Sequence, residues 1–441
     1  MFSNRDLVYL LVPLILEQLL TSLMGMIDTV MVSNISSAAI SAVSLVDSIN
    51  ILVLMALAAL ATGGTIVVSQ YIGSENVKKA NEAARQIVLC VTVISVALSI
   101  FCLVFRQGLL SIIFGSVEQE VMDGAMTYFF YTALSFPFLA LYNAGSSIFR
   151  AQRNTKLPLL ISVLSNVINV VGNYFLIFIV KWGIAGAAIA TLFSRVILAV
   201  IIMIALRSED YAVNVRDYFS IRPNKTLIVR ILKLGIPSGI ENSMFQFGKL
   251  AIQSTVSTLG TIAIAAQAMT NILENLNGMA ALAVGIGMMT VVGQCLGAGK
   301  KEEAVYYIKK MTVVAEVICV ISCILVYLIA KPVTILGGME KEAAKLCMEM
   351  VFAITIVKPI MWTIAFVPAY GMRAAGDVKF SMISSMCIMW LCRVILCIVL
   401  CRYFHFGPMG VWIAMFTDWT VRAIVFGWRF YSKRWLSHQV I

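Results

Sequence analysis

Residues 87–105 read IVLCVTVISVALSIFCLVF, a long stretch without a charged side chain. A helix needs about 20 mostly apolar residues to cross a bilayer, whereas a strand of a transmembrane barrel needs about ten with alternating polarity. The whole chain of 441 residues is 61% hydrophobic and only 12% charged, which is too few polar residues for a soluble protein. The sequence therefore predicts an all-α integral membrane protein.

Similar apolar stretches follow one another along the chain, and we predict twelve transmembrane helices. The predicted spans are 7–33, 38–70, 82–105, 121–148, 157–180, 184–206, 230–257, 262–296, 308–330, 345–371, 380–402 and 408–431. The first span is longer than the core of a signal peptide and contains Glu17 and Asp28, so we expect it to stay in the protein as the first helix.

The positions of Lys and Arg predict the orientation, because short cytoplasmic loops retain positive charges. With the N-terminus inside, the inner segments hold most of these residues and the outer loops hold few. The formal net charge of +11 is therefore a topology signal, and we expect no nucleic-acid partner. We predict a monomer in the lipid bilayer of the bacterial cytoplasmic (inner) membrane, with both termini in the cytoplasm.

The sequence lacks the motifs of several common kinds of binding site and enzyme. The ten cysteines lie mostly inside apolar runs, and there are only two histidines, so we expect neither a disulfide framework nor a His-based metal site. The stretch GAGK at 297–300 is not a phosphate loop, because position 294 is Gln and position 301 is Lys. No DDxxD motif for a membrane transferase occurs. We expect no enzyme activity and no cofactor.

The chain contains an internal duplication. Residues 67–76 read VVSQYIGSEN, and residues 291–300 read VVGQCLGAGK. We call the separation between these two stretches the repeat shift. The same shift relates Pro13 to Pro237, Glu17 to Glu241, Gly63 to Gly287 and Gln70 to Gln294. In both copies a Gln-x-x-Gly motif ends a helix, and its glycine suits a left-handed cap.

The duplication predicts two pseudo-symmetric six-helix bundles. We place an N-lobe at 1–206, a cytoplasmic linker at 207–229 and a C-lobe at 230–441. Because six is even, the two lobes share one orientation, and an axis along the membrane normal relates them. Paired bundles of this kind bind substrate near the midplane and expose it to each side alternately.

Charges inside the spans carry most of the functional information, because an ionisable group at the bilayer centre costs about 2.5–3.5 kcal/mol on insertion scales. In the first span Glu17 and Asp28 are three helical turns apart and point the same way, with Met24 on the same stripe. Pro13 precedes them and can kink the helix.

Three amides lie on one face of the span 157–180, at Asn166, Asn169 and Asn173. Such a stripe either joins helices by hydrogen bonds or supplies oxygen ligands to a cation. Counting Asp28, with its charge, together with these amides favours the cation site.

The ordered set of motifs resembles the multidrug and toxin extrusion (MATE) family of bacterial transporters. The first motif, P-x3-E-x10-D-T-x-M-V, runs from Pro13 to Val32. It is followed by the two Q-x-x-G motifs, and by R-A-x-x-[ND]-x-K at 150–156 and 373–379. The resemblance implies a cation-coupled multidrug efflux antiporter, which exports organic cations or drugs by alternating access in exchange for Na⁺ or H⁺.

The resemblance also implies a cation site formed by Asp28, Asn169, Asn173 and Thr191, which would be the metal site if the coupling ion is Na⁺. Some relatives have Asp where this chain has Asn173, so the site here carries one formal charge. That leaves Na⁺ and H⁺ both open. The C-lobe carboxylates of other relatives correspond to neutral positions, including Phe245, so we transfer no second cation site.

Further residues are candidates for substrate binding or gating. Glu17 and Glu241 follow a proline in each lobe, and Lys249 either snorkels or forms an ion pair with Glu274. The apolar candidates, which packing explains equally well, are Met24, Phe136, Phe245 and Met279.

A flippase for a lipid-linked saccharide or related amphiphile is the alternative function. It would need a strongly cationic central cavity, and few Lys or Arg lie inside the spans. Those present are Arg195, Lys249, Lys358, Arg393 and Arg422.

Overall fold

The computed structural model describes residues 1–115 and 117–441, and these residues form helices without any strand. A helix satisfies its backbone hydrogen bonds within one segment, which the hydrocarbon region of a membrane requires. The α-helices are α1 (Asn4–Ser33), α2 (Ser37–Gly73), α3 (Val77–Val104), α4 (Arg106–Phe114), α5 (Gln119–Leu134), α6 (Phe136–Ala151), α7 (Lys156–Asn173), α8 (Gly183–Leu206), α9 (Lys225–Val256), α10 (Thr261–Gly297), α11 (Lys301–Leu336), α12 (Lys341–Ala374), α13 (Val378–Ile388), α14 (Leu396–Arg402) and α15 (Pro408–Tyr431). Two π-helices, η1 (Tyr174–Ile179) and η4 (Met389–Ile395), and three 3-10 helices, η2 (Tyr218–Ser220), η3 (Ser257–Leu259) and η5 (Arg434–Ser437), complete the structure.

The predicted all-α membrane fold is confirmed. In the described part of the chain, 10 helical segments are long and apolar enough to cross a membrane, or 11 if α5 and α6 count as one broken span. The helix α9, with 32 residues, completes the predicted twelve, although its charged side chains make it less apolar.

The span 121–148, predicted as one helix, is bent. The pair α5 and α6 meets at an angle of 41° around Ser135. The physical reason is Pro137, which has no N–H to donate to the preceding turn and restricts the residue before it.

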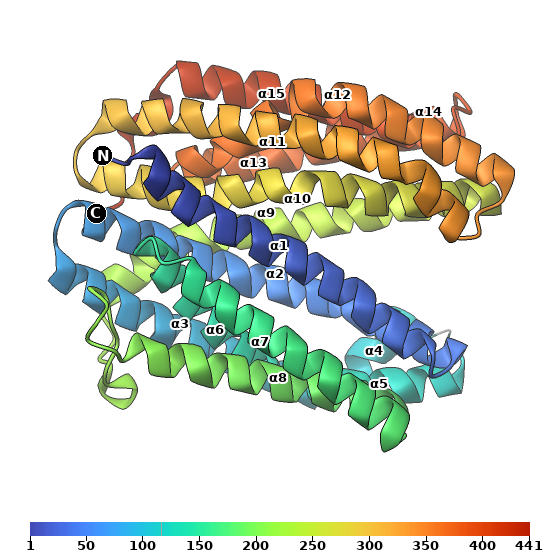
Figure 1. Ribbon diagram of the computed structural model, residues 1–441, viewed down its shortest axis with the longest axis horizontal. Helices are drawn as coiled ribbons and strands as arrows, with labels where there is room; N and C mark the ends of the chain where they lie inside the picture. Colours follow the sequence, from blue (N-terminus) through green and yellow to red (C-terminus); the bar gives the residue numbers. More distant parts are fainter. Residues whose placement is uncertain (116) are drawn as a thin grey trace. The chain divides into compact units, whose positions relative to one another are not determined.

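The chain forms two compact units. We call Leu20–Gly239 the N-unit, and Met1–Leu19 together with Ile240–Ile441 the C-unit. The helices α1 and α9 therefore each contribute one part to each unit. Figure 1 colours α2 to α8 from blue to green and α10 to α15 from yellow to red. The sequence-based limits of the two lobes stay a prediction.

One close helix contact occurs in both units. In the N-unit, a Cβ on Gly63 of α2 would lie 2.8 Å from the backbone of Gly235 and Ile231 on α9. In the C-unit, a Cβ on Gly287 of α10 would lie 2.6 Å from the Leu11 side chain on α1. The repeat shift that relates the two copies of the sequence also relates these contacts. At Gly63 the backbones themselves approach closely, which glycine permits, whereas at Gly287 the nearest atoms are the ends of leucine side chains.

The beginnings of α1 and α9 are held in a similar way. In the C-unit, Phe2 N donates to the Tyr307 hydroxyl on α11 at 2.7 Å. The N-terminal ammonium lies 2.9 Å from Glu303, whose hydrogen bond raises the pKa of that amine. In the N-unit, Asn224 N donates to Gln86 on α3 at 3.0 Å. Each unit thus fixes the start of one of these two shared helices.

The two Q-x-x-G motifs end α2 and α10 as predicted, but their glycines are not the left-handed residues. Gly73 and Gly297 are the last helical residues, and positive φ occurs two positions later, at Glu75 (58°) and Gly299 (73°). The N–H after each left-handed residue bonds to the carbonyl five residues before it, and this bond sets the position of the cap.

Apolar packing holds each unit together. In the N-unit, α2 packs against α3, α5 and α6, and α7 packs against α8. In the C-unit, a buried cluster joins α10, α11, α12 and α15 around Trp412. The Trp412 indole donates to Gln267 at 2.9 Å, which satisfies its one polar atom in the core.

We predict that Gly63→Ala lowers the thermal stability of the purified protein in detergent. The added methyl group would displace the backbone of α9, and overpacking of this kind costs about 1–3 kcal/mol. Gly427→Ala is the matched control, because no atom lies within 4 Å of the new methyl group there. Equal melting temperatures for the two variants would show that the contact is not tight.

Candidate functional site

The four residues of the predicted cation site lie together in the N-unit. They come from α1, α7 and α8 and form a continuous chain of hydrogen bonds. Asn173 Nδ2 donates to Asp28 Oδ1 at 2.9 Å and to Asn169 Oδ1 at 3.2 Å. Asn169 Nδ2 donates to Thr191 Oγ1 at 3.4 Å. Three helices therefore meet at one carboxylate and three neutral polar groups.

The local backbone places the two amides. Asn169 and Asn173 are one helical turn apart, and α7 changes into the π-helix η1 directly after Asn173. Wide turns of this kind are frequent at functional sites because they reorient the side chains beside them. Asn173 Oδ1 is buried and has no hydrogen-bond partner in the described part of the chain. Rotation of this amide would turn an oxygen, instead of an N–H, toward Asp28.

Two further charged residues belong to this site. Asp47 on α2 and Arg195 on α8 both act electrostatically on Asp28. Asp47 accepts a hydrogen bond from Asn50 at 3.3 Å, and Arg195 donates to Ser135 at 2.7 Å. Two carboxylates and one guanidinium give the site one net negative charge. The sequence interpretation missed Asp47, although its place inside the apolar span 38–70 is the same signal that drew attention to Asp28.

The first-helix residues are divided between the units. Glu17 is buried in the part of α1 that belongs to the C-unit, whereas Asp28 and the half-buried Met24 belong to the N-unit. Phe136, a candidate for drug contact, is fully buried at the start of α6. Met279 on α10 is half-buried.

Glu241, the repeat partner of Glu17, forms an ion pair. Arg373 Nη2 lies 2.7 Å from Glu241 Oε1, and Arg373 is the first residue of the second R-A-x-x-[ND]-x-K motif. Asp377 of the same motif binds Arg429 through two bonds, of 2.7 and 3.1 Å. This motif therefore ties α9, α12 and α15 together by charged pairs.

A cluster of charged side chains lies inside the C-unit, and we call it the C-unit charge cluster. Its members are Lys249, Glu274, Lys358, Arg393, Asp418 and Arg422. Lys358, fully buried on α12, binds the Glu274 carboxylate and the Asn277 side chain, and it donates to Glu274 O at 3.0 Å. The predicted alternative of a Lys249–Glu274 ion pair is therefore wrong, because Glu274 pairs with Lys358.

The ammonium of Lys358 has a site shaped for it. A Cβ on Gly278 would lie 2.9 Å from Lys358 Nζ, so a larger residue there would displace the ammonium from its present position beside α10. The rings of Trp362 and Trp419 lie 4.8 and 5.9 Å from the ammonium. Carboxylate, carbonyl, amide and aromatic faces together replace the water that a buried ammonium loses.

The remaining members of the cluster are unevenly paired. Asp418 on α15 binds two cations, Arg393 at 2.7 Å and Arg422 at 3.2 Å. Lys249 and Arg393 both lie beside the Phe245 ring, with their charged atoms 5.3 and 5.1 Å from its centre. Positive charge thus exceeds negative charge around Phe245.

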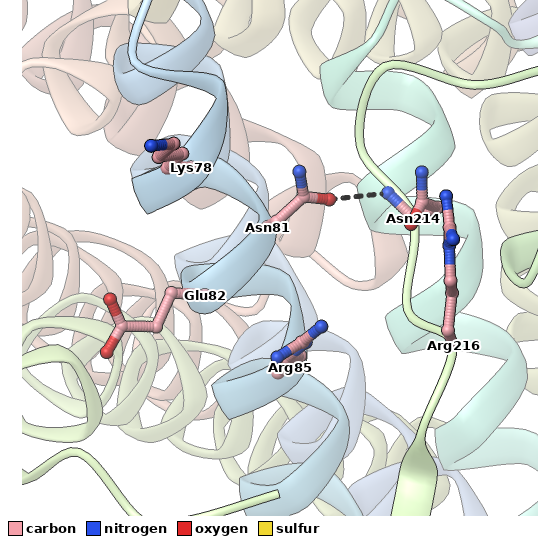
Figure 2. A pocket seen from close by; sticks show the side chains of 6 residues that line it. All are labelled: Lys78, Asn81, Glu82, Arg85, Asn214 and Arg216. Carbon is pink, nitrogen blue, oxygen red and sulfur yellow. Dashed lines mark hydrogen bonds between the residues drawn. The ribbon is translucent and has the colours of Figure 1, made fainter. Parts of the chain in front are cut away.

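An open pocket of about 550 Å³ lies where α3 meets the segment after α8. Figure 2 shows its lining, with Asn214 N donating to Asn81 Oδ1 at 2.7 Å. The pocket is lined by Lys78, Asn81, Glu82, Arg85, Asn214 and Arg216. None of the predicted site residues lies in it. The pocket contains three cations and one carboxylate. Its cations belong to the Lys and Arg residues of the predicted cytoplasmic segments.

The donor set at Asp28 limits the ions that it can hold. Among residues 1–115 and 117–441, no three His, Cys, Asp or Glu side chains come close enough to hold a metal ion. A cation at Asp28 would therefore be bound by a carboxylate and by neutral amide and hydroxyl oxygens. Such oxygen ligands suit a hard cation or a proton, and they do not suit a metal ion that needs thiolate or imidazole ligands.

A duplicated helical bundle with a carboxylate and amides inside its membrane helices is the architecture of a secondary transporter. The MatE family model matches the chain twice, at residues 13–175 and 237–399. The two matches begin at Pro13 and Pro237, so the repeat shift of the internal duplication also separates them. The chain belongs to the MatE family of multidrug and toxin extrusion transporters, and it is not an enzyme.

Individual relatives agree with this assignment. The chain is 26% identical to a probable multidrug resistance protein NorM of Thermotoga maritima, covering 99% of this chain and 94% of the relative. It is also 26% identical to the uncharacterized transporter YisQ of Bacillus subtilis, covering 96% and 93%. A crystal structure of MATE in complex with MaD3S has the same fold, with a TM-score of 0.88, 20% identity and coverage of 97% of this chain and 96% of that one. The chain is thus an efflux transporter with small-molecule substrates.

We predict that Lys358→Met destabilises the protein by about 3–5 kcal/mol, because it leaves the Glu274 carboxylate without its partner in an apolar interior. Addition of Glu274→Gln should restore most of the loss, since the pair is then replaced by neutral groups. The measurement is the melting temperature in detergent, with the exposed Lys331→Met on α11 as control. No rescue in the double variant would contradict the pairing.

Proposed function

We propose that the chain is an antiporter that exports organic cations in exchange for Na⁺ or H⁺ bound at Asp28. The observation that supports the proposal is the hydrogen-bond chain from Asp28 through Asn173 and Asn169 to Thr191. An acidic group inside a membrane helix persists where it has a partner or a function, and here its partner is one amide.

Either coupling ion has a defined effect on this hydrogen-bond chain. A proton on Asp28 removes its charge and weakens the bond from the Asn173 amide, since bonds to charged acceptors are the stronger ones. Na⁺ instead needs several oxygens, and rotation of the Asn173 amide would supply one next to the Asp28 carboxylate. Both ions therefore act on the contact between α1 and α7.

The charge balance supports one monovalent ion per cycle. Asp28, Asp47 and Arg195 together carry one net negative charge, which one H⁺ or one Na⁺ neutralises. A divalent ion would leave an excess positive charge inside the membrane helices, at a large desolvation cost.

Coupling requires that the ion and the exported molecule prefer different states of the transporter, because only a difference in affinity shifts the equilibrium. α1 is suited to carry this effect, since Asp28 lies in its N-unit part while its first part packs in the C-unit. Occupancy of Asp28 thus changes the packing of a helix that both units share.

We further propose a monomer in the bacterial inner membrane with both termini in the cytoplasm. The orientation is supported by the Lys- and Arg-rich inner segments, including Lys78, Arg85 and Arg216 around the pocket of Figure 2.

We predict that Asp28→Asn lowers gradient-driven export of ethidium about tenfold or more, because the neutral amide no longer changes charge with the coupling ion. The measurement is ethidium efflux from proteoliposomes under imposed Na⁺ or pH gradients. Asp123→Asn, an exposed carboxylate in the same unit, is the control.

The same assay separates the remaining options. Wild-type efflux that follows the Na⁺ gradient at constant pH identifies Na⁺ as the coupling ion, and the reverse identifies H⁺. Full gradient-dependent efflux by Asp28→Asn would refute the site. A wild-type protein that moves a lipid-linked saccharide and not ethidium would favour the flippase.

A further inference from the structure

The C-unit charge cluster contains a cation for which residues 1–115 and 117–441 supply no counter-ion within ion-pair distance. Glu274 is paired with Lys358, and Asp418 is already shared by two arginines. Lys249 is left over, because no carboxylate lies within ion-pair distance of it in the described part of the chain. A lone cation among membrane helices is costly, so its presence indicates a function.

Snorkelling does not explain the position of Lys249. A snorkelling ammonium would extend toward the nearer end of α9, at Val256. Instead Lys249 Nζ lies 5.3 Å from the ring centre of Phe245, one helical turn back toward the middle of α9. The ammonium therefore lies over the Phe245 ring and away from the nearer helix end, within electrostatic range of Glu274 and Arg393.

Arg393 completes a cationic site around the same ring. Its guanidinium lies 5.1 Å from the Phe245 ring centre, and its side chain is almost fully buried. Its Nε has no hydrogen-bond partner in the described part of the chain. Arg393 also lies in the π-helix η4, and π-turns are frequent at functional sites. The second cation is thus buried in a π-helix with one donor unused.

The duplication relates this cationic pair to the cation site of the other unit. At the repeat shift, Arg393 corresponds to Asn169, and the position of Asp28 is taken by Ile252. Asn169 and Arg393 also lie close to or within the two π-helices of the structure, η1 and η4. The related positions therefore differ in charge, because an amide of the N-unit is replaced by a guanidinium and its carboxylate by an apolar side chain.

We propose that Lys249, supported by Arg393, binds an acidic group of the transported molecule while the Phe245 ring packs against its apolar part. This inference rests on the proposed efflux function and extends its substrate class to amphiphiles that carry a carboxylate or a similar oxyanion. Lys249 is accessible and supplies the ion pair, while the buried Arg393 adds a fixed positive potential behind it.

The test compares two dyes that differ only in the acidic group, tetramethylrhodamine with a free carboxylate and its methyl ester. Equilibrium binding to the purified protein in detergent is measured by fluorescence anisotropy. We expect Lys249→Gln to weaken binding of the acid about tenfold and to leave ester binding within about twofold, because only the acid loses an ion pair. Lys249→Arg should keep most of the affinity for the acid.

Controls make the outcome specific. Lys345→Gln, an exposed lysine of the same unit, should change neither affinity. Equal weakening of both dyes by Lys249→Gln, or no binding of the acid to the wild type, would overturn the anion site. If Lys249→Gln does not fold, competition decides on the wild type: decanoate must displace the acid dye better than decanol does.

A transport arm keeps this inference separate from the proposed function. Gradient-driven export of both dyes is measured in proteoliposomes with the wild type. If both dyes bind but neither is exported, the antiporter proposal fails while the binding comparison still decides the anion site. If the ester is exported and the acid is neither bound nor exported, the anion site fails and the antiporter remains.

Discussion

The structure depends on one constraint: inside hydrocarbon there is no water to satisfy a polar group, so each must find its partner within the chain. The backbone groups find their partners within helices, and every long apolar stretch forms one. For side chains the answer is pairing across helices, as between Lys358 and Glu274 or around Asp418. The same constraint gives meaning to the groups that remain less well paired. Among the described residues, Asp28 has one amide partner and Lys249 has no carboxylate within ion-pair distance, and these two residues define the proposed cation and anion sites.

Much of the fold could be predicted, because the two strongest signals are long-range and redundant. Apolar stretches of sufficient length specify helices, and a constant repeat shift over many positions specifies a duplication. The structural details that the sequence does not predict depend on a few backbone hydrogen bonds. The bend at Ser135 and the left-handed Glu75 are set by which single N–H finds which carbonyl, and periodicity carries no information about that. The π-helices η1 and η4 add one residue to a turn and leave the apolar pattern intact.

The site was predictable to a smaller extent. Spacing places Asn169 and Asn173 on one face, and a charge inside the first span singles out Asp28. The family resemblance adds Thr191, and the structure joins all four by hydrogen bonds. What the sequence cannot contain is the partner of each charge. Lys358 and Glu274 are 84 residues apart on different helices, so the competing choice of Lys249 for Glu274 was equally reasonable before the fold was known. Charges inside spans can be recognised from sequence, but pairing is a property of packing.

The two units show how a duplicated scaffold can hold opposite charges. Its helix crossings are set by glycine contacts, at Gly63 in one unit and Gly287 in the other, and these contacts contain no charged group. Side chains deeper in each unit could therefore change without loss of the crossing, provided that each new charge found a partner. The N-unit contains a net negative site around Asp28, and the C-unit contains a net positive site around Phe245. In the two proposals an acidic group of the cargo meets the positive site of one unit while a cation is exchanged at the negative site of the other, so the two bound charges do not compete for the same residues.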